Sequence, residues 1–300
     1  MPIIKKGFGA AKPAYQRVLW HPNFVKKYCI KYRLNDKPKL KMHFVFKDSR
    51  LQNRDNIQPK LFKQRNTDAE KLRNQYLDGG GWQQIDGWLY LKALRLTDFL
   101  DKCQDFANIK GNIGEIGLYF GKYFIFLYLI CRNNENIIGV DLFEFSEWEK
   151  TFYQNFKNWR YSEKEPIIIK RNSLQIDSKE LLEKSNGPYR MFSVDGGHST
   201  EVALHDLRLA NEVLVDGGII MLDDYFDPKF PGVSEAVCRF FLLHPKEVRV
   251  APFLITGNKL FFATIDYADL YRKAIDDAID RASEEVWDSE IFGSKVITIL

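Results

Sequence analysis

Between residues 112 and 222, short apolar runs alternate with longer amphipathic stretches, and this alternation constrains the fold more than any other feature of the chain. The short runs have the length of buried strands, and the amphipathic stretches have the length of helices. In chain order the segments are 112–116, 124–131, 137–140, 148–159, 167–169, 180–184, 190–194, 201–214 and 218–222. A strand–helix–strand order at this spacing predicts βαβ units, and therefore an α/β fold with a doubly wound, mostly parallel sheet.

Further elements are expected on both sides of this alternation. Apolar residues at helical spacing predict helices over 68–76 and 89–106, and an amphipathic stretch predicts a last helix over 267–286. The runs 248–254 and 259–264 flank a short Gly-containing turn and predict a β-hairpin. We divide the chain into a basic N-terminal extension, a central domain and a C-terminal helix and tail, with the bounds 1–80, 81–265 and 266–300.

Composition excludes several classes of protein. A chain of 300 residues that is 45% hydrophobic and 28% charged can bury a sizeable core, which argues against a disordered or collagen-like chain. The longest wholly apolar run, 124–131, is far shorter than the roughly 20 residues that cross a bilayer, and the N-terminus does not resemble a signal peptide. Cys29, Cys103, Cys131 and Cys238 form no CxxC pair, so reduced thiols are expected. We expect a soluble, cytoplasmic protein.

Basic residues concentrate at the start of the chain. Residues 1–66 hold 17 Lys and Arg against 3 Asp and Glu, and the remainder holds 27 against 37. Such a segment attracts polyanions, or else forms a solvated extension that packs on an acidic body. No RNA-binding aromatic box, KH loop or zinc knuckle accompanies it, so nucleic acid is not expected as a partner. The segment 15–62 could also complete the site of a second copy, which leaves a homo-oligomer open.

A glycine turn follows the first strand of the alternation. The spacing Glu115-x-Gly117-x-x-x-Gly121 places a strand, a sharp turn and a helix in succession, with Tyr119 inside the turn. In a doubly wound sheet the ligand lies where the first strand ends, and glycine lets the backbone approach it closely. The spacing is neither G-x-G-x-x-G nor a P-loop. A nucleotide-type ligand is expected here, with a plain tight turn as the alternative.

The next two strands also end in polar residues. Asp141 ends the second strand, where a carboxylate can accept hydrogen bonds from both hydroxyls of an adenosine ribose. Its alternative role is to cap the helix that follows. The third strand is followed by Asn172 and Ser173, whose short side chains could contact an adenine edge.

Acidic residues and a histidine follow the fourth and fifth strands. Asp195 ends the fourth, and Asp223 and Asp224 end the fifth, so parallel pairing would bring the three to one edge. Clustered carboxylates repel one another, so a divalent cation with oxygen ligands is expected among them. His198, three residues after Asp195, is placed to take a proton at this edge, whereas Asp224 could instead cap a turn.

With both ends in view, the segment from about 88 to 264 resembles a class I S-adenosylmethionine-dependent methyltransferase, closest to the macrocin-type sugar and small-molecule O-methyltransferases. The matching motifs are Glu115-Ile-Gly117-x-x-x-Gly121, Asp141-Leu-Phe, Val194-Asp195-Gly-Gly-His198, Gly217-Gly218 through Asp223-Asp224-Tyr225, and Pro231-Gly232-Val233-Ser-Glu-Ala-Val237. The resemblance implies a seven-stranded Rossmann-like sheet with an antiparallel final strand. It makes 81–265 the S-adenosylmethionine-binding methyltransferase domain.

The resemblance also implies roles for particular residues. The cofactor residues would be Glu115, Gly117, Tyr119, Gly121, Asp141, Leu142, Asn172, Ser173 and Asp195. Mg²⁺ would be bound by Asp195, Asp223 and Asp224, with His198 as the base and Asp195 beside it in catalysis. The acceptor is expected to be a small molecule with a hydroxyl, which could belong to a sugar, a phenol or a linked glycan.

Two alternatives to O-methyl transfer are compatible with an α/β fold of this kind. An NAD(P)-dependent oxidoreductase on a similar sheet is disfavoured, because the first loop lacks G-x-G-x-x-G and no suitably placed Tyr-x-x-x-Lys pair follows. A non-catalytic adaptor would use the sheet as a scaffold and the basic N-terminus to bind polyanions. The clustered Asp195, His198, Asp223 and Asp224 argue against it, because a scaffold gains nothing from them.

Overall fold

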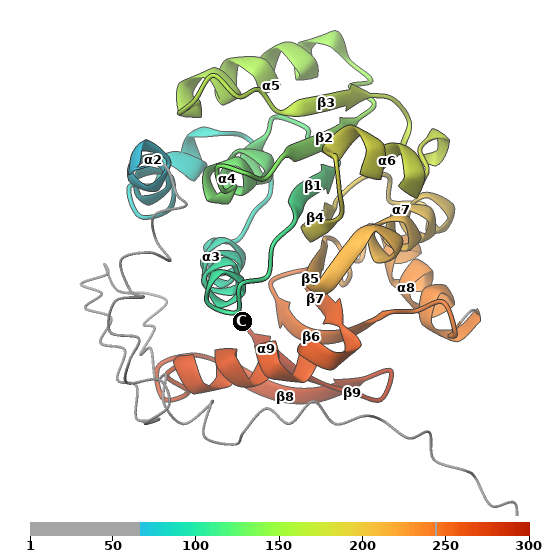
Figure 1. Cartoon of the computed structure of the whole chain (residues 1–300). Helices are drawn as coiled ribbons and strands as arrows, with labels where there is room; N and C mark the ends of the chain where they lie inside the picture. The colour runs from blue at the N-terminus through green and yellow to red at the C-terminus, as the bar shows by residue number, and fades with distance from the viewer. Residues whose placement is uncertain (1–66, 244) are drawn as a thin grey trace, which may run out of the picture.

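A mixed nine-stranded sheet runs through the part of the chain that the computed structural model describes, residues 67–243 and 245–300. The predictions made for 1–66 therefore lie outside the described residues. The strand order is β3-β2-β1-β4-β5-β7-β6-β9-β8 (Figure 1). The strands are β1 Asn112–Ile116, β2 Ile137–Asp141, β3 Ile167–Lys170, β4 Tyr189–Val194, β5 Leu214–Leu222, β6 Val250–Thr256, β7 Lys259–Thr264, β8 Val286–Ile291 and β9 Ser294–Ile299.

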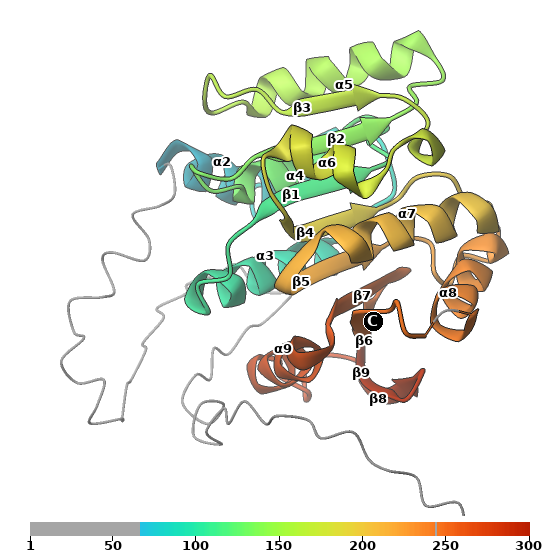
Figure 2. The same ribbon diagram turned by 45° about the vertical axis from the view of Figure 1, so that its right-hand side comes forward.

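Helices cover both faces of the sheet (Figures 1 and 2). One buried cluster contains side chains of α2, α3, α4, α5 and α9, and a second contains side chains of α6, α7 and α8. The helices are α2 Thr67–Leu77, α3 Leu91–Phe106, α4 Lys122–Ile130, α5 Ser146–Trp159, α6 Ser178–Ser185, α7 Thr200–Val213, α8 Pro231–Leu243 and α9 Ile265–Ala278, with short 3-10 turns η4 Gly81–Gln84 and η5 Ser173–Gln175. This arrangement confirms the predicted doubly wound fold.

Strand direction brings the candidate residues to one edge. β1 pairs in parallel with β2 and β4, and β4 pairs in parallel with β5. Ile116 is in register with both Val140 and Val194, and Val194 is in register with Leu222. The strands therefore end level with one another, and the residues just beyond these ends lie side by side. β7 runs antiparallel to both β5 and β6, as expected for the predicted hairpin.

The C-terminal part of the described chain differs from the expectation. The sheet has two strands more than the seven expected, because β8 and β9 form a hairpin that extends it beyond β6. The helix predicted over 267–286 ends at Ala278. Phe292 and Gly293 both have positive φ, as in the two-residue turns that suit hairpins. In β9 the residues Val296, Ile297 and Ile299 are buried, whereas β8 is exposed along most of its length and carries charged residues, so it lacks the apolar run expected of a strand.

The described residues contain no helix with the length and apolarity needed to cross a membrane. The apolar run at 124–131 belongs to α4, a helix of nine residues in which every side chain from Tyr123 to Ile130 is buried. Cys103, Cys131 and Cys238 are free thiols, and Cys29 lies outside the described residues. The run is therefore part of the protein core.

Candidate functional site

The glycine turn after β1 lies directly against the loop after β4. Gly117 has a φ of 89°, and a Cβ built on it would lie 1.7 Å from the backbone oxygen of Asp195. Gly121, the N-cap of α4, has a φ of 86°, and a Cβ there would meet the ring of Phe152 at 3.0 Å. Glycine is needed at Gly117 for both its conformation and its close approach to the next loop. The glycine at 117 is therefore explained by packing against the loop after β4, and a ligand at this turn stays a prediction.

Asp141 joins the end of β2 to this turn. One carboxylate oxygen accepts hydrogen bonds from the backbone N–H groups of Leu118 at 2.6 Å and Tyr119 at 2.9 Å. The other accepts from the N–H of Phe143 at 2.6 Å. The N-cap of α5 is Phe145, so Asp141 does not cap that helix. The carboxylate holds the glycine turn in place and keeps lone pairs for further donors.

Aromatic and apolar side chains lie beside Asp141. Tyr119 stacks on Phe120 at a centroid distance of 3.8 Å and meets Trp148 edge-on at 5.1 Å. Trp148 in turn meets Phe145 at 4.9 Å. Leu142 and Phe145 are about half exposed although both are large and apolar. This surface could receive a flat apolar group next to a carboxylate.

Asn172 and Ser173 lie at the end of β3 and are engaged in local structure. The Asn172 side chain accepts a hydrogen bond from the N–H of Leu174 at 3.0 Å and caps η5. Ser173 is buried, and its backbone oxygen lies 2.9 Å from Nε2 of His205. The contacts in the structure give these residues a turn-stabilising role, and their contact with an adenine stays a prediction.

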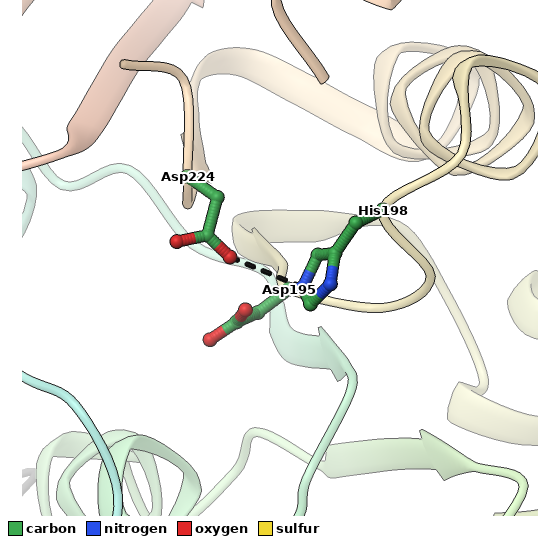
Figure 3. Close-up of side chains that lie close together, drawn as sticks. All are labelled: Asp195, His198 and Asp224. Carbon is green, nitrogen blue, oxygen red and sulfur yellow. Dashed lines mark ion pairs between the residues drawn. The ribbon is translucent and has the colours of Figure 1, made fainter. Parts of the chain in front are cut away.

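Asp195, His198 and Asp224 come together between the ends of β4 and β5, as Figure 3 shows. One ligand atom from each lies within 4.8 Å of the others. Nε2 of His198 is 3.1 Å from Oδ2 of Asp224, and the imidazole stacks on Phe230 at 3.8 Å. The structure thus assembles a histidine–carboxylate pair with a second carboxylate beside it.

Asp223 faces a different partner. Its Oδ2 lies 2.5 Å from Nζ of Lys259, the first residue of β7. The Lys259 side chain is 2% exposed, and its Nζ also lies 3.9 Å from Oδ2 of Asp195. Among the described residues, Asp223 is not part of the group formed by Asp195, His198 and Asp224. The three aspartates therefore share an edge without forming one cluster.

Asn258 in the β6–β7 turn and Lys259, the first residue of β7, complete the site. The sequence analysis did not identify either residue. Asn258 donates a hydrogen bond from Nδ2 to Oδ1 of Asp224 at 2.7 Å, and its backbone oxygen accepts from the N–H of Tyr225. Lys259 binds Asp223 as described above. The sequence signal for Lys259 was a lysine at the start of a predicted strand in which most other residues are apolar. In the structure, every residue of this strand is buried.

Burial alters the acid–base behaviour beneath the edge. Glu115 is 1% exposed and accepts a hydrogen bond from Oγ of Ser193 at 3.0 Å. Burial raises the pKa of Glu115 to about 8, although Lys259 acts in the opposite direction. Burial and then the neighbouring Asp223 raise the pKa of Asp195 well above its usual range. The edge therefore holds less negative charge at neutral pH than its carboxyl count suggests.

A match to a known family covers most of the site residues. Residues 115–225, from the glycine turn to the end of β5, match the family model described as a methyltransferase domain. The match to this methyltransferase domain spans 111 of the 300 residues. The match confirms the resemblance to a methyltransferase and the expectation of an enzyme. Lys259 and Asn258 lie outside the matched residues of the methyltransferase domain.

Solved structures that are similar to this chain include three O-methyltransferases. The apo structure of CalS11, a TDP-rhamnose 3'-O-methyltransferase of calicheamicin biosynthesis, is 16% identical over 58% of this chain and 79% of that chain, with a TM-score of 0.47. NovP is 15% identical over 57% and 79%, with a TM-score of 0.47. TomG from Streptomyces achromogenes, in complex with SAM, is 14% identical over 73% and 99%, with a TM-score of 0.46. No curated protein matches the sequence.

Proposed function

We propose that this protein is an S-adenosylmethionine-dependent O-methyltransferase that methylates a hydroxyl of a sugar or another small molecule, such as a phenol or a linked glycan. One observation carries the proposal. Asp195 touches the glycine turn through its backbone and faces His198 through its side chain, so a nucleotide-type turn and a proton-accepting pair share one edge. Transfer between two bound molecules requires this proximity.

The residues around the glycine turn fit the cofactor. The backbone at Gly117 leaves no room for a side chain, Asp141 keeps acceptor capacity, and Leu142 offers an exposed apolar surface. S-adenosylmethionine, when bound, supplies a methyl group on a sulfonium. We assign its contacts to Glu115, Gly117, Tyr119, Gly121, Asp141, Leu142, Asn172, Ser173 and Asp195.

His198 is the residue that takes the proton of the acceptor hydroxyl. Its Nε2 lies 3.1 Å from Oδ2 of Asp224, so we place the ring proton on Nε2 and the free lone pair on Nδ1. The Asp224 carboxylate stabilises the imidazolium that forms, and stacking on Phe230 fixes the plane of the ring. Asn258 holds Asp224 in turn. The pair is therefore oriented before an acceptor binds.

Exposed aromatic rings at the β6–β7 turn, after β5 and before α3 support an acceptor that contains a ring. The ring of Tyr90 lies over Gly257, next to Asn258, and Phe226 follows the end of β5 with 57% of its surface exposed. Trp88, two residues before Tyr90, is 87% exposed. Aromatic faces pack well against phenols and the apolar faces of sugars.

The metal predicted from the sequence needs separate treatment. The described side chains do not fit a three-aspartate set, because Lys259 binds Asp223 and the remaining group is Asp195, His198 and Asp224. Magnesium assistance is therefore left out of the proposed function, and no step of the transfer is derived through a metal ion.

His198→Gln tests the assignment. Glutamine still donates to Asp224 but cannot accept a proton, so kcat should fall by about 10²–10⁴-fold. The affinity for S-adenosylhomocysteine, measured by calorimetry, should stay unchanged, and NAD⁺ should give no heat. The control is His205→Gln, a histidine on α7 that should keep wild-type turnover.

Two results would contradict the proposed function. Wild-type turnover by His198→Gln would show that another group takes the proton. If the wild-type protein binds NAD⁺ but not S-adenosylhomocysteine, the proposed function would be oxidoreduction instead of methyl transfer.

A further inference from the structure

We propose that the Lys259 ammonium takes the place of a divalent cation at the β5 end of the site, so that methyl transfer by this protein requires no metal ion. The inference rests on the proposed function and adds to it a positioning residue that the sequence motifs do not contain. It follows from the disagreement between the predicted aspartate set and the contacts that these aspartates make.

Lys259 is held inside the protein. Its Nζ lies 2.5 Å from Asp223 and 3.9 Å from Asp195, and it sits 4.7 Å from the centroid of the Tyr123 ring. The Tyr123 hydroxyl is bound to Oγ1 of Thr97 at 2.7 Å, so the ring itself is fixed. A surface lysine would swing into solvent when a metal ion arrived. A lysine that is 2% exposed has no such path.

The ammonium and a metal ion would compete for the same oxygens. Mg²⁺ binds carboxylate oxygens at about 2.1 Å. An ion on Oδ2 of Asp223 would therefore lie within about 5 Å of Nζ, close enough for strong repulsion between the two cations in a buried site. A cation that faces both Asp223 and Asp195 is already present at this edge as part of the chain.

The other carboxylates at this edge are also bound by groups of the chain. Oδ1 of Asp224 accepts from Asn258, and Oδ2 faces Nε2 of His198. Asp195 lies within ion-pair distance of Lys259. A metal ion would have to displace these contacts, which argues for a network that is complete without one.

Lys259 also positions the proton-accepting pair. Oδ1 of Asp223 accepts a hydrogen bond from the backbone N–H of Asp224 at 3.0 Å. Asp224 has a φ of 60°, a left-handed conformation that aspartate tolerates better than most residues. By fixing Asp223, Lys259 stabilises the turn that points Asp224 toward His198. Lys259 is thus a positioning residue that acts through Asp223 and Asp224.

The test is a Mn²⁺ titration of the full chain, with free Mn²⁺ followed by electron paramagnetic resonance. The wild-type protein should bind no Mn²⁺ at this site below about 1 mM. Lys259→Met removes the charge and keeps the length of the side chain, so it should bind Mn²⁺ at least about tenfold more tightly. Adding Asp223→Asn to that variant should remove the gained binding. Turnover by the wild type should be the same with and without EDTA.

Several results would overturn the inference. One is micromolar binding of Mn²⁺ by the wild type, if Asp223→Asn or His198→Gln abolishes that binding. The other is a loss of wild-type turnover in EDTA, if Mg²⁺ restores the turnover. If Lys259→Met does not fold, the wild type, Asp223→Asn and Lys259→Arg decide the question, since Arg keeps the charge and should exclude Mn²⁺. A wild type that binds neither S-adenosylhomocysteine nor Mn²⁺ would refute the proposed function but leave metal exclusion by Lys259 standing.

Discussion

At the end of β2, one carboxylate serves three backbone N–H groups and is also assigned to a ribose. Asp141 fixes Leu118 and Tyr119 of the glycine turn, so it shapes the turn even without a ligand. The effect of changing it should therefore appear in cofactor affinity before it appears in the chemical step.

Asp141→Ala should weaken the binding of S-adenosylhomocysteine by at least about tenfold, equivalent to roughly 1.4 kcal/mol. The loss combines a missing acceptor with a loosened glycine turn, and kcat at saturating cofactor should change little. The matched control is Asp177→Ala, which removes another aspartate that accepts from a backbone N–H, at the N-terminus of α6. That variant should lose about 1 kcal/mol of stability and no affinity. Equal affinities in calorimetry would contradict the assignment of Asp141.

Asp206 on α7 lies beneath the loop that carries Asp195 and His198. A Cβ on Gly196 would lie 2.8 Å from Oδ2 of Asp206, and the residue is fully buried. Burial raises the pKa of Asp206 to about 6. The folded state therefore holds this proton more tightly than the unfolded state, and the stability should fall as the pH rises from about 4 to about 6.

Asp206→Asn removes this ionisation. The variant should gain about 1–3 kcal/mol of unfolding free energy relative to wild type at pH 7 and nothing at pH 4. Urea unfolding at a series of pH values measures both. Parallel stability profiles for the two proteins would show that Asp206 ionises normally in the folded state.

Part of the site follows from the sequence because strand direction alone decides it. Asp195, His198 and Asp224 each follow a predicted strand, and parallel neighbours end at the same edge. Lys259 and Asn258 could not be placed in this way. They reach the site because β7 inserts antiparallel beside β5, a pairing between segments far apart that no local pattern encodes. The pairing of Asp223 with Lys259 was missed for the same reason.

Among the elements, the turn between β1 and α4 depends most on a single residue. Gly117 combines a positive φ with contact against the backbone of Asp195. Gly293, in the β8–β9 turn, also has a positive φ, of 73°, but a Cβ there would meet nothing within 4 Å. Substitutions at the two glycines therefore separate the free-energy cost of the left-handed backbone conformation from the cost of a steric clash.

Gly293→Ala should lose only about 1–2 kcal/mol, the cost of a left-handed conformation for a residue with a Cβ. Gly117→Ala should lose about 2–5 kcal/mol, because the backbone of the neighbouring loop must also move. It should lose measurable affinity for S-adenosylhomocysteine as well, whereas Gly293→Ala should keep it. Similar losses of stability in thermal unfolding would mean that the two loops can separate at little cost.

A strand could be predicted from the sequence where both of its faces are buried. Strands with an exposed face were harder to predict. β1 and β4 are buried at every position, and their apolar character was visible in the sequence. β8 is exposed at most positions and carries charged residues, so nothing in its composition marked it as a strand. The predicted last helix was accordingly extended past Ala278 to Val286, the first residue of β8.

Across the whole molecule, the hairpin closes the side of the sheet farthest from the glycine turn. β9 pairs in parallel with β6 and buries Val296, Ile297 and Ile299. The site extends from β3 to β7 in the strand order, so the β8–β9 hairpin should contribute to stability without contributing to catalysis.

Ile297→Ala in the full chain tests this separation. Ile297 is fully buried, and its truncation should cost about 2–5 kcal/mol. For a chain of this size the cost corresponds to a fall in Tm of roughly 5–15 °C. Trp287→Ala on β8 is the control, because Trp287 is 59% exposed and its loss should leave Tm nearly unchanged. At a temperature where both variants are folded, kcat and the affinity for S-adenosylhomocysteine should match those of the wild type. A fall in kcat for Ile297→Ala without unfolding would show that the hairpin affects the site through β6 and β7, because these strands connect it to Asn258 and Lys259.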